Sequence, residues 1–569
     1  MSAETINGAR IVLETLHRLG VTDMFGYPGG AVIPIYDEIY SFPEIKHYFV
    51  RHEQGAAHAA DGYARVSGKV GVCLATSGPG ATNLVTGIMT AYMDSVPMVA
   101  ITGQVGRALI GKDSFQEADI QGITMPITKH NYLVQDIHDL PRIIKEAYFI
   151  AGTGRPGPVL IDIPKDIQTE KISMAEYNKL YDVPIHLEGY DPTYKGHQGQ
   201  IKKAATLIKN AKRPLIIAGA GVLKSGAMAE LKELAEKAQI PVANTLVGLG
   251  GFPGNHELAL GMVGMHGSVA ANNCTEDADL VIAAGIRFHD RITGHPDFFC
   301  KKAKIIHIDI DPAEIDKNVT INVPIVGDLK RVLTELNTLV EPTTHESWIA
   351  QIREWQQEYP MVVPESTHGE LHPQYVLSEL NKIAKDDAII VTDVGQHQMW
   401  AAQFLTHKAP HTIVTSGGAG TMGYGLPAAI GAQVGAPNKQ VILVVGDGGF
   451  QMTCEELMMV RQYNLPIKIV IINNGYLGMV RQWQQIFNDR RYSYVDLEVS
   501  PDFLKLADAF DLKAARFDSV ETFNKDFKSY ITSDESIVLD CRVEREDNVL
   551  PMIPAGGTVS GMMGKKGVL

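Results

Sequence analysis

Two short polar segments near the C-terminal third carry the residue types that bind a metal ion and a phosphate together. Asp447 lies in the segment Gly-Asp-Gly-Gly-Phe (446–450), and Asn474 lies in Ile-Ile-Asn-Asn-Gly (471–475). A carboxylate and an amide oxygen suit Mg²⁺, which takes few protein ligands and completes its shell with diphosphate oxygens and water. The neighbouring glycines would let the backbone approach a phosphate closely.

Each polar segment follows an apolar, β-branched run that predicts a buried parallel strand. The runs cover 441–445 and 467–472, and a helical stretch at 455–463 between them predicts a βαβ unit. Both polar segments then fall at the carboxyl ends of strands, where open α/β sheets bind ligands. Taken singly, each segment could also be an ordinary turn rich in Gly and Asn.

The spacing of the two segments resembles the fingerprint of thiamine diphosphate enzymes, with 24 residues (449–472) between Gly448 and Asn473. The resemblance implies that Mg²⁺ is held by Asp447, Asn474 and the backbone carbonyl of Tyr476. It also implies that the diphosphate is held by Gly395, Gln396, His397, Gly446 and Gly448. The aminopyrimidine would be held by Gly420 and Met422. Met422 taken alone would be an ordinary core residue.

The whole chain predicts three α/β blocks, because 569 residues exceed what one core can organise. Strands, glycine loops and helices alternate in each block, which is typical of parallel sheets. The fold class predicted is α/β, with three parallel-sheet domains of the thiamine diphosphate enzyme type. We expect a pyrimidine-binding domain at 1–165, a linker at 166–195, a central FAD-binding-like domain at 196–340, a linker at 341–372 and a diphosphate- and Mg²⁺-binding domain at 373–569.

Composition excludes several classes of function. A net charge of −14 argues against sequence-independent binding of nucleic acid, which needs a basic surface. The sequence has no run of about 18 apolar residues that would span a membrane. Five cysteines form no Cys-x-x-Cys pair, which favours a reducing compartment. We therefore expect a cytoplasmic enzyme without a nucleic-acid or membrane partner.

The first block contains a carboxylic acid in apolar surroundings. Glu53 follows a strand-like run at 47–50, and Ala56, Ala57 and Ala60 surround it at helical spacing. Removal from water suits an acid that exchanges a proton during catalysis. The alternative is a surface glutamate at the start of a helix.

Motifs along the entire chain resemble acetohydroxyacid (acetolactate) synthase, catalytic subunit. They occupy 25–31, 52–54, 76–83, 94–98, 111–117, 126–131 and 478–483. In that family the residue matching Glu53 bonds N1′ of the cofactor's aminopyrimidine. The resemblance implies that the active site also contains Gly30, Phe115, Gln116 and Lys165.

The same resemblance implies the reaction. Pyruvate would be decarboxylated on thiamine diphosphate, and the two-carbon unit would be joined to a second 2-oxo acid. The product would be 2-acetolactate from pyruvate or 2-aceto-2-hydroxybutyrate from 2-oxobutyrate, the first common step of branched-chain amino-acid biosynthesis.

Four residues are candidates for binding the acceptor 2-oxo acid. Met479, Val480 and Trp483 share one face of a helix by their spacing, which by itself favours core packing. The family resemblance implies instead that Trp483 shapes the acceptor pocket. It also implies that Arg291 binds the acceptor carboxylate, for which its guanidinium fork is suited.

The middle block resembles the FAD-binding part of the anabolic synthases. Gly219-Ala-Gly221 after a strand is a weak dinucleotide signal, because Lys224 replaces the last glycine of the pattern. The FAD would be structural, since the reaction has no net redox change. The resemblance implies that FAD contacts Arg155, His266, Gly267, Gly285, Arg287, Asp309 and Asp328.

Two residues depart from the family pattern. His289 precedes Asp290 where the family has consecutive aspartates, and Gly106 stands where a proline is common. The first departure concerns the geometry of the flavin or acceptor site, and the second concerns a loop near the substrate entrance.

The resemblance also implies the partners. The cofactor would lie between the first block of one subunit and the third block of another, so a homodimer or homotetramer is expected. A small regulatory subunit accompanies many family members. Three alternatives stay open at this point: a flavin-free catabolic acetolactate synthase, a pyruvate oxidase, and a catalytically silent scaffold.

Overall fold

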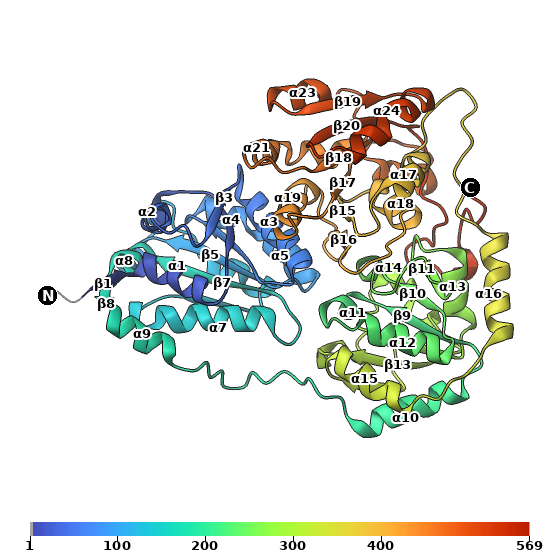
Figure 1. Ribbon diagram of the computed structural model, residues 1–569, viewed down its shortest axis with the longest axis horizontal. Coiled ribbons are helices and arrows are strands. Elements are labelled where there is room, and N and C mark those ends of the chain that lie inside the picture. Colours follow the sequence, from blue (N-terminus) through green and yellow to red (C-terminus); the bar gives the residue numbers. More distant parts are fainter. Residues whose placement is uncertain (1–3, 568–569) are drawn as a thin grey trace.

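The computed structural model describes residues 4–567 and contains three six-stranded parallel sheets flanked by helices (Figure 1). Each sheet forms the centre of one domain, which confirms the predicted α/β class with three parallel-sheet domains. We call these the first domain (4–182), the middle domain (198–358) and the third domain (373–548). Among the described residues, no helix has the length and apolar character needed to cross a membrane.

The first domain has the strand order β3-β2-β4-β5-β7-β6. A separate two-stranded antiparallel sheet joins β1 to β8. The strands are β1 (Thr5–Asn7), β2 (Asp23–Gly26), β3 (Lys46–Phe49), β4 (Gly71–Ala75), β5 (Met98–Gln104), β6 (His130–Leu133), β7 (Pro158–Pro164) and β8 (Lys171–Ser173). The helices are α1 (Gly8–Arg18), α2 (Ile33–Tyr40), α3 (Glu53–Ser67), α4 (Pro79–Asn83), α5 (Val85–Met93), α6 (Ile120–Thr124), α7 (Leu140–Gly152), α8 (Lys165–Thr169) and α9 (Met174–Asp182).

Residues 166–182, which we expected in the first linker, are folded onto the first domain. β8 pairs with β1, and Tyr177 of α9 is fully buried. These elements are too short to show a clear apolar period, so tertiary packing decides their structure. The extended connection is confined to 183–197 and runs from α9 to α10 along the lower edge of the molecule (Figure 1).

The middle domain has the strand order β11-β10-β9-β12-β13-β14. Its strands are β9 (Pro214–Ala218), β10 (Val242–Asn244), β11 (Ala259–Met262), β12 (Leu280–Ala284), β13 (Lys304–Asp309) and β14 (Val323–Val326). Its helices are α10 (Gln198–Asn210), α11 (Ala220–Lys224), α12 (Met228–Ala238), α13 (Val269–Asp277), α14 (Asp290–Thr293), α15 (Leu329–Leu339) and α16 (Glu346–Glu358). Part of the second expected linker belongs here, because α16 buries Trp348 and Ile352 in the core of this domain.

The third domain has the strand order β16-β15-β17-β18-β20-β19. Its strands are β15 (Ile389–Thr392), β16 (Ile413–Val414), β17 (Val441–Gly446), β18 (Lys468–Asn473), β19 (Lys513–Phe517) and β20 (Ile537–Arg542). Its helices are α17 (Pro373–Ile383), α18 (Gln396–Phe404), α19 (Gly425–Gly435), α20 (Asp447–Gln451), α21 (Leu457–Gln462), α22 (Gly478–Phe487), α23 (Phe503–Ala509) and α24 (Val520–Thr532). β17 and β18 are direct neighbours, as the βαβ prediction requires.

The first and third domains share one hydrophobic core, in which α3 packs against α19. Two glycines allow the close approach of these helices. A side chain at Gly62 would overlap the carbonyl of Ala428, and one at Gly431 would overlap the carbonyl of Ala59. The domains are therefore tied to each other within one chain, and not only through their linkers (Figure 1).

The segment after the third domain returns to the middle domain. Ile553 donates its backbone N–H to Met265 at 2.7 Å, and His295 donates to Gly557 at 3.1 Å. Ile553 and Met562 also pack on Val269 of α13. The C-terminal segment thus joins the middle and third domains on the side that carries α14.

Candidate active site

The carboxyl ends of β15, β17 and β18 meet at one pocket with an empty volume of about 440 Å³. The structure brings together there all residues predicted for the diphosphate and the metal, and one of the two predicted for the aminopyrimidine, Met422. They are Gly395, Gln396, His397, Met422, Gly446, Asp447, Gly448, Asn474 and Tyr476, accompanied by Met479 and Val480 of α22. Gly420 does not line the pocket; it lies two residues before Met422 with φ +65°, a conformation that favours glycine.

Asp447 is the electrostatically unusual group of this pocket. Asp447 is the first residue of α20 and is 1% exposed. Its Oδ2 has no hydrogen-bond partner within residues 4–567. Burial raises the pKa of this carboxyl to about 7. A buried carboxylate without a partner is costly, and a nearby cation removes that cost. The site therefore fits a metal ion at Asp447.

The other predicted metal ligands, Asn474 and Tyr476, lie in the loop after β18 and line the same pocket as Asp447. Asn474 donates from Nδ2 to Gln396 Oε1 at 3.1 Å, and its Oδ1 accepts from the Tyr476 N–H at 3.1 Å. The described residues contain no cluster of three His, Cys, Asp or Glu side chains suited to a metal. The predicted donor set of one carboxylate, one amide and one carbonyl is the kind that leaves room for diphosphate oxygens on Mg²⁺.

His397 provides a neutral hydrogen-bonding group in the pocket. Burial lowers its pKa to about 3, and its Nε2 has no partner among the described residues. Its ring lies against Gly446, where a Cβ atom would stand only 2.8 Å from Nδ1. Glycine at 446 is thus required by space, and the imidazole lies beside the turn that begins at Gly446.

The first domain gathers its own predicted residues at the carboxyl edge of its sheet. Glu53 opens α3 after β3, is 9% exposed and accepts from Asn83 Nδ2 at 2.9 Å. Gly30 follows β2, Gln116 lies in the loop after β5, and Lys165 follows β7. The predicted burial of Glu53 is therefore present, and a partner that orients its carboxyl is identified.

The loop after β5 presents two further candidates in different ways. Phe115 is 89% exposed, whereas the backbone of Gln116 touches Gly78. Gly78 has φ +60°, and a Cβ there would lie 2.8 Å from the Gln116 carbonyl oxygen. No first-domain residue lines the pocket of Asp447, so within one chain Glu53 and Asp447 do not share a cavity.

Two acceptor-site candidates from different domains meet in the structure. The guanidinium carbon of Arg291, on α14, lies 5.7 Å from the centre of the Trp483 ring on α22. Met479 and Val480 of the same helix line the Asp447 pocket, and Val480 is 48% exposed. A charged group and an indole thus lie together, and the helix that carries the indole also supplies an apolar wall to the Asp447 pocket.

A second, larger cleft of about 1070 Å³ empty volume lies at the carboxyl edge of the middle-domain sheet. Five of the seven residues predicted for FAD line it: Arg155, Gly285, Arg287, Asp309 and Asp328. Gly285 has φ +62°, and a Cβ on Gly221 would stand 2.6 Å from its Cα. These close backbones leave room for a long ligand over the strand ends, so the cleft fits a dinucleotide.

His266 and Gly267 do not line this cleft. His266 is buried and lines a separate cavity with Gln403, to whose side chain its carbonyl is bonded at 2.9 Å. The two departures from the family pattern are also placed. His289 lines the cleft and caps α14 by accepting from the Arg291 N–H at 3.2 Å. Gly106 has φ −57°, which a proline would also adopt.

Sequence reasoning missed Lys224, which it treated only as a break in the glycine pattern. Lys224 lines the cleft and donates to the carbonyl of Ser95 at 2.7 Å. Burial lowers its pKa to about 7. Asp94, beside Ser95, also lines the cleft. No local sequence pattern marks these contacts, because they join distant segments of the chain. Lys224 and Ser95, for example, are 129 positions apart in the sequence.

Three family models match successive parts of this chain. They are "Thiamine pyrophosphate enzyme, N-terminal TPP binding domain" at 6–123, "Thiamine pyrophosphate enzyme, central domain" at 201–336, and "Thiamine pyrophosphate enzyme, C-terminal TPP binding domain" at 393–541. The fold is thus that of a thiamine pyrophosphate enzyme.

Comparison with curated relatives identifies the family within this class of enzymes. The acetolactate synthase large subunit of Lactococcus lactis subsp. lactis is 48% identical over 559 residues, covering 98% of this chain and 96% of that protein. That of Pyropia yezoensis is 49% identical over 567 residues, with 98% and 95% covered. That of Mycobacterium tuberculosis is 47% identical over 582 aligned positions, with 100% and 93% covered. The chain belongs to the acetolactate synthase family of thiamine pyrophosphate enzymes.

Proposed function

We propose that this acetolactate synthase decarboxylates pyruvate and joins the two-carbon unit to a second 2-oxo acid. Pyruvate as acceptor gives 2-acetolactate, and 2-oxobutyrate gives 2-aceto-2-hydroxybutyrate, the first common step of branched-chain amino-acid biosynthesis. The observation that carries the proposal is the buried Asp447 carboxylate, whose Oδ2 has no partner among the described residues, in a pocket with Asn474 and in a chain 48% identical to an acetolactate synthase large subunit.

The third domain holds Mg²⁺ and the diphosphate in this proposal. Asp447, Asn474 and the Tyr476 carbonyl bind the metal, while His397 and the 446–449 turn contact phosphate oxygens. When bound, thiamine diphosphate supplies the electron sink needed to break a carbon–carbon bond beside a carbonyl. The raised pKa of Asp447 supports this assignment, because the ion would restore the charged form of the carboxyl.

Glu53 exchanges a proton with N1′ of the aminopyrimidine in this proposal. Its burial excludes water, and Asn83 at 2.9 Å orients the carboxyl. Gly30, Phe115, Gln116 and Lys165 occupy the same sheet edge and would face the substrate. Since Glu53 does not line the pocket of Asp447 in one chain, the complete site would use Glu53 of a second copy, in a homodimer or homotetramer.

The acceptor is bound between the middle and third domains in this proposal. Arg291 would bind the carboxylate of the acceptor through its guanidinium fork. Trp483, 5.7 Å from that guanidinium carbon, would form the wall that distinguishes a methyl from an ethyl side chain. The middle-domain cleft would hold FAD as a structural group, contacted by Arg155, Gly285, Arg287, Asp309 and Asp328. A small regulatory subunit as partner and a cytoplasmic location are further parts of this proposal.

The test is product analysis with the purified chain, pyruvate, Mg²⁺ and thiamine diphosphate, with and without FAD. We expect acetolactate that depends on FAD. Acetolactate without bound or added flavin would indicate the catabolic type and overturn the FAD assignment. Acetate or peroxide in place of acetolactate would indicate an oxidase. No product with bound cofactors, even after adding a regulatory subunit, would contradict the proposed reaction.

A further inference from the structure

All three domains meet at the carboxylate of Asp94, the residue that follows α5. Its Oδ2 accepts from the Gly417 N–H at 2.9 Å, and its Oδ1 accepts from the Gly418 N–H at 2.8 Å. Both amides belong to the third-domain loop 415–424 between β16 and α19. Asp94 also lines the middle-domain cleft, with Arg287 Nη2 at 4.0 Å. One side chain thus contacts the thiamine-binding domain and the wall of the flavin cleft.

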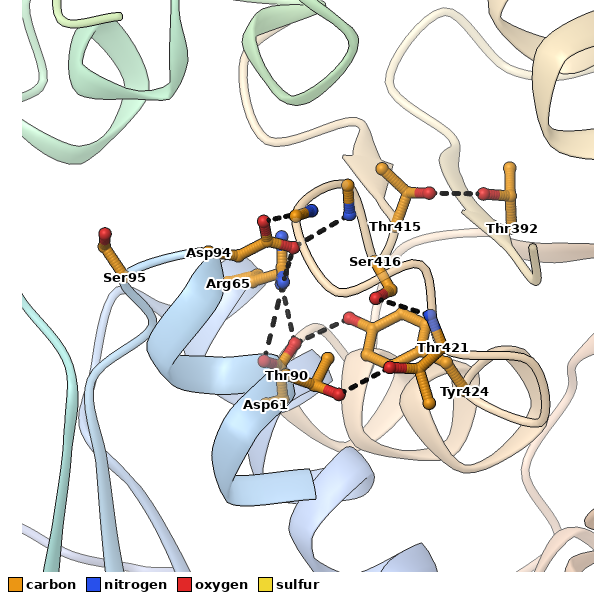
Figure 2. Close-up of polar contacts among 12 residues, drawn as sticks. Asp61, Arg65, Thr90, Asp94, Ser95, Thr392, Thr415, Ser416, Thr421 and Tyr424 are labelled. Carbon is orange, nitrogen blue, oxygen red and sulfur yellow. Dashed lines mark hydrogen bonds and ion pairs between the residues drawn. The ribbon is translucent and has the colours of Figure 1, made fainter. Parts of the chain in front are cut away.

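A buried ion-pair network holds this carboxylate in place (Figure 2). Arg65 of α3 bridges Asp94, at 2.9 Å, and Asp61, at 2.6 Å. The side chains of Asp61 and Asp94 are 0% and 1% exposed. Tyr424, at the end of the loop, donates its hydroxyl to Asp61 at 2.6 Å. Buried charges need such partners, so the position of Asp94 is strongly determined.

The loop has little freedom to move independently of this network. Thr421 is bonded at 2.7 Å to Thr90 of α5, which lies one helical turn before Asp94 (Figure 2). A Cβ on Gly418 would stand 2.9 Å from Asp94 Oδ1, and one on Gly417 would overlap Val247 of the middle domain. The same loop carries Gly420 and leads to Met422, which lines the Asp447 pocket.

The middle domain reaches the same corner through a second bond. Lys224 of α11 donates to the carbonyl of Ser95, the neighbour of Asp94, at 2.7 Å. Residues of the first domain (Asp94, Ser95, Arg155) and of the middle domain (Lys224, Arg287) together line one cleft. A ligand that fills the cleft must therefore contact both domains at the point where the loop is anchored.

We propose that Asp94 is a positioning residue that couples the two cofactor sites, so that a flavin nucleotide in the cleft tightens thiamine diphosphate binding through loop 415–424. The cleft ligand disfavours conformations in which the first and middle domains separate, and the loop is ordered by the same contacts. Coupling is reciprocal, so thiamine diphosphate tightens flavin binding by the same factor. This inference rests on the proposed function.

The test compares the two binding equilibria in the apoprotein. The Kd of thiamine diphosphate with Mg²⁺ is measured by tryptophan fluorescence with and without saturating FAD, and the Kd of FAD is measured by flavin fluorescence with and without thiamine diphosphate. For the wild type we expect both ratios to be equal and roughly 5-fold or more, the range usual for coupled sites. A ratio of one, with both cofactors bound, would overturn the inference alone. Failure to bind either cofactor would overturn the proposed function and the inference with it.

Two variants test whether the coupling between the two cofactor sites depends on Asp94. Asp94→Asn keeps the size of the side chain and removes its charge, and we expect the ratio to fall toward one while FAD still binds. Thr90→Val is the matched control, because it removes a loop hydrogen bond that does not face the cleft. It should weaken thiamine diphosphate binding and leave the ratio unchanged. An unchanged ratio in folded Asp94→Asn would contradict the role of Asp94.

A second variant covers the case in which Asp94→Asn does not fold. Lys224→Met has a similar length and removes the bond to the Ser95 carbonyl without touching the loop. We expect this variant to fold, to bind thiamine diphosphate as the wild type does in the absence of FAD, and to show a reduced ratio. A wild-type ratio in Lys224→Met, with FAD bound, would refute coupling through this corner.

Discussion

Replacing Asp447 by Asn should stabilise the cofactor-free protein while abolishing its response to the metal. The carboxyl is buried, Oδ2 has no partner within the described residues, and burial raises its pKa from 3.8 to about 7. The pKa difference is about 3 pH units, and each unit corresponds to roughly 1.4 kcal/mol. Ionisation of Asp447 therefore lowers the folding stability of the apoprotein by about 4 kcal/mol. This value is an upper bound, because the surroundings of the carboxylate can relax.

The sign of the pH dependence follows from proton linkage. Between pH 3.8 and about 7 the folded state binds more protons at this carboxyl than the unfolded state does. Stability therefore falls as pH rises through this window, and the full loss is present above pH 7. The neutral Asn does not ionise, so the advantage of Asp447→Asn should be largest near pH 8 and should shrink toward pH 4.

The assay is thermal unfolding of cofactor-free wild type and variant over this pH range. For a domain of 150–250 residues, 1 kcal/mol changes Tm by about 2–4 °C, so a rise of several degrees near pH 8 is expected. Adding Mg²⁺ and thiamine diphosphate should raise the Tm of the wild type and hardly change that of the variant. Equal Tm values at pH 8 and equal responses to cofactor would refute the reasoning.

Asp393→Asn is the contrasting control in the same domain. Burial also raises the pKa of Asp393, to about 6, but this carboxylate accepts three backbone N–H bonds. The donors are Gly425 at 2.7 Å, Val394 at 2.8 Å and Gly423 at 3.2 Å. In Asp393→Asn the amide nitrogen replaces one of the two accepting oxygens, so a backbone N–H loses its acceptor at a cost of about 1–3 kcal/mol, which offsets the gain from removing the buried charge. Asp393→Asn should thus raise Tm less than Asp447→Asn does, or lower it.

Three further substitutions test other parts of the account. Glu53→Gln should fold normally and lower turnover by roughly 100-fold or more, because the amide cannot exchange a proton; near-normal turnover would remove Glu53 from the proton-transfer step. Trp483→Leu should change the ratio of the two products by roughly 10-fold or more when pyruvate and 2-oxobutyrate compete. An unchanged ratio would return Trp483 to a packing role. Gly431→Ala would overlap the Ala59 carbonyl and should cost about 1–3 kcal/mol, measured as a lower Tm. Gly152→Ala, which meets only Val70 at 3.5 Å, is its control, and equal Tm values would contradict the tight α3–α19 contact.

The parts of the fold that were predictable are those with strong local patterns. The apolar run at 441–445 lies within β17 and the run at 467–472 overlaps β18, because fully buried strands need uninterrupted apolar residues. The prediction that residues 166–182 belong to a linker was wrong. β8 in this segment has only three residues, and its pairing partner β1 lies at the other end of the domain in the sequence. Short edge elements of this kind carry too little sequence pattern to be recognised.

The residues of the candidate site also fall into those that the sequence predicts and those that it does not. Asp447 and Asn474 could be paired from the sequence, because neighbouring parallel strands bring their carboxyl ends together. The contact of Arg291 with Trp483 depends on how the C-terminal segment fixes the third domain against α14, which no local pattern encodes. Lys224 and Asp94 were missed for the same reason. Their contacts lie between domains, and each side chain taken alone resembles an ordinary surface charge.

The most direct measurement is acetolactate formation by a mixture of two inactive variants, Glu53→Gln and Asp447→Ala, made by co-expression. If Glu53 of one subunit acts on the cofactor held by Asp447 of the other, a mixed dimer contains one intact site. Random pairing then predicts about one quarter of wild-type activity, since half of the dimers are mixed and each has one of two sites. No acetolactate from mixed dimers whose formation has been demonstrated would contradict a shared active site.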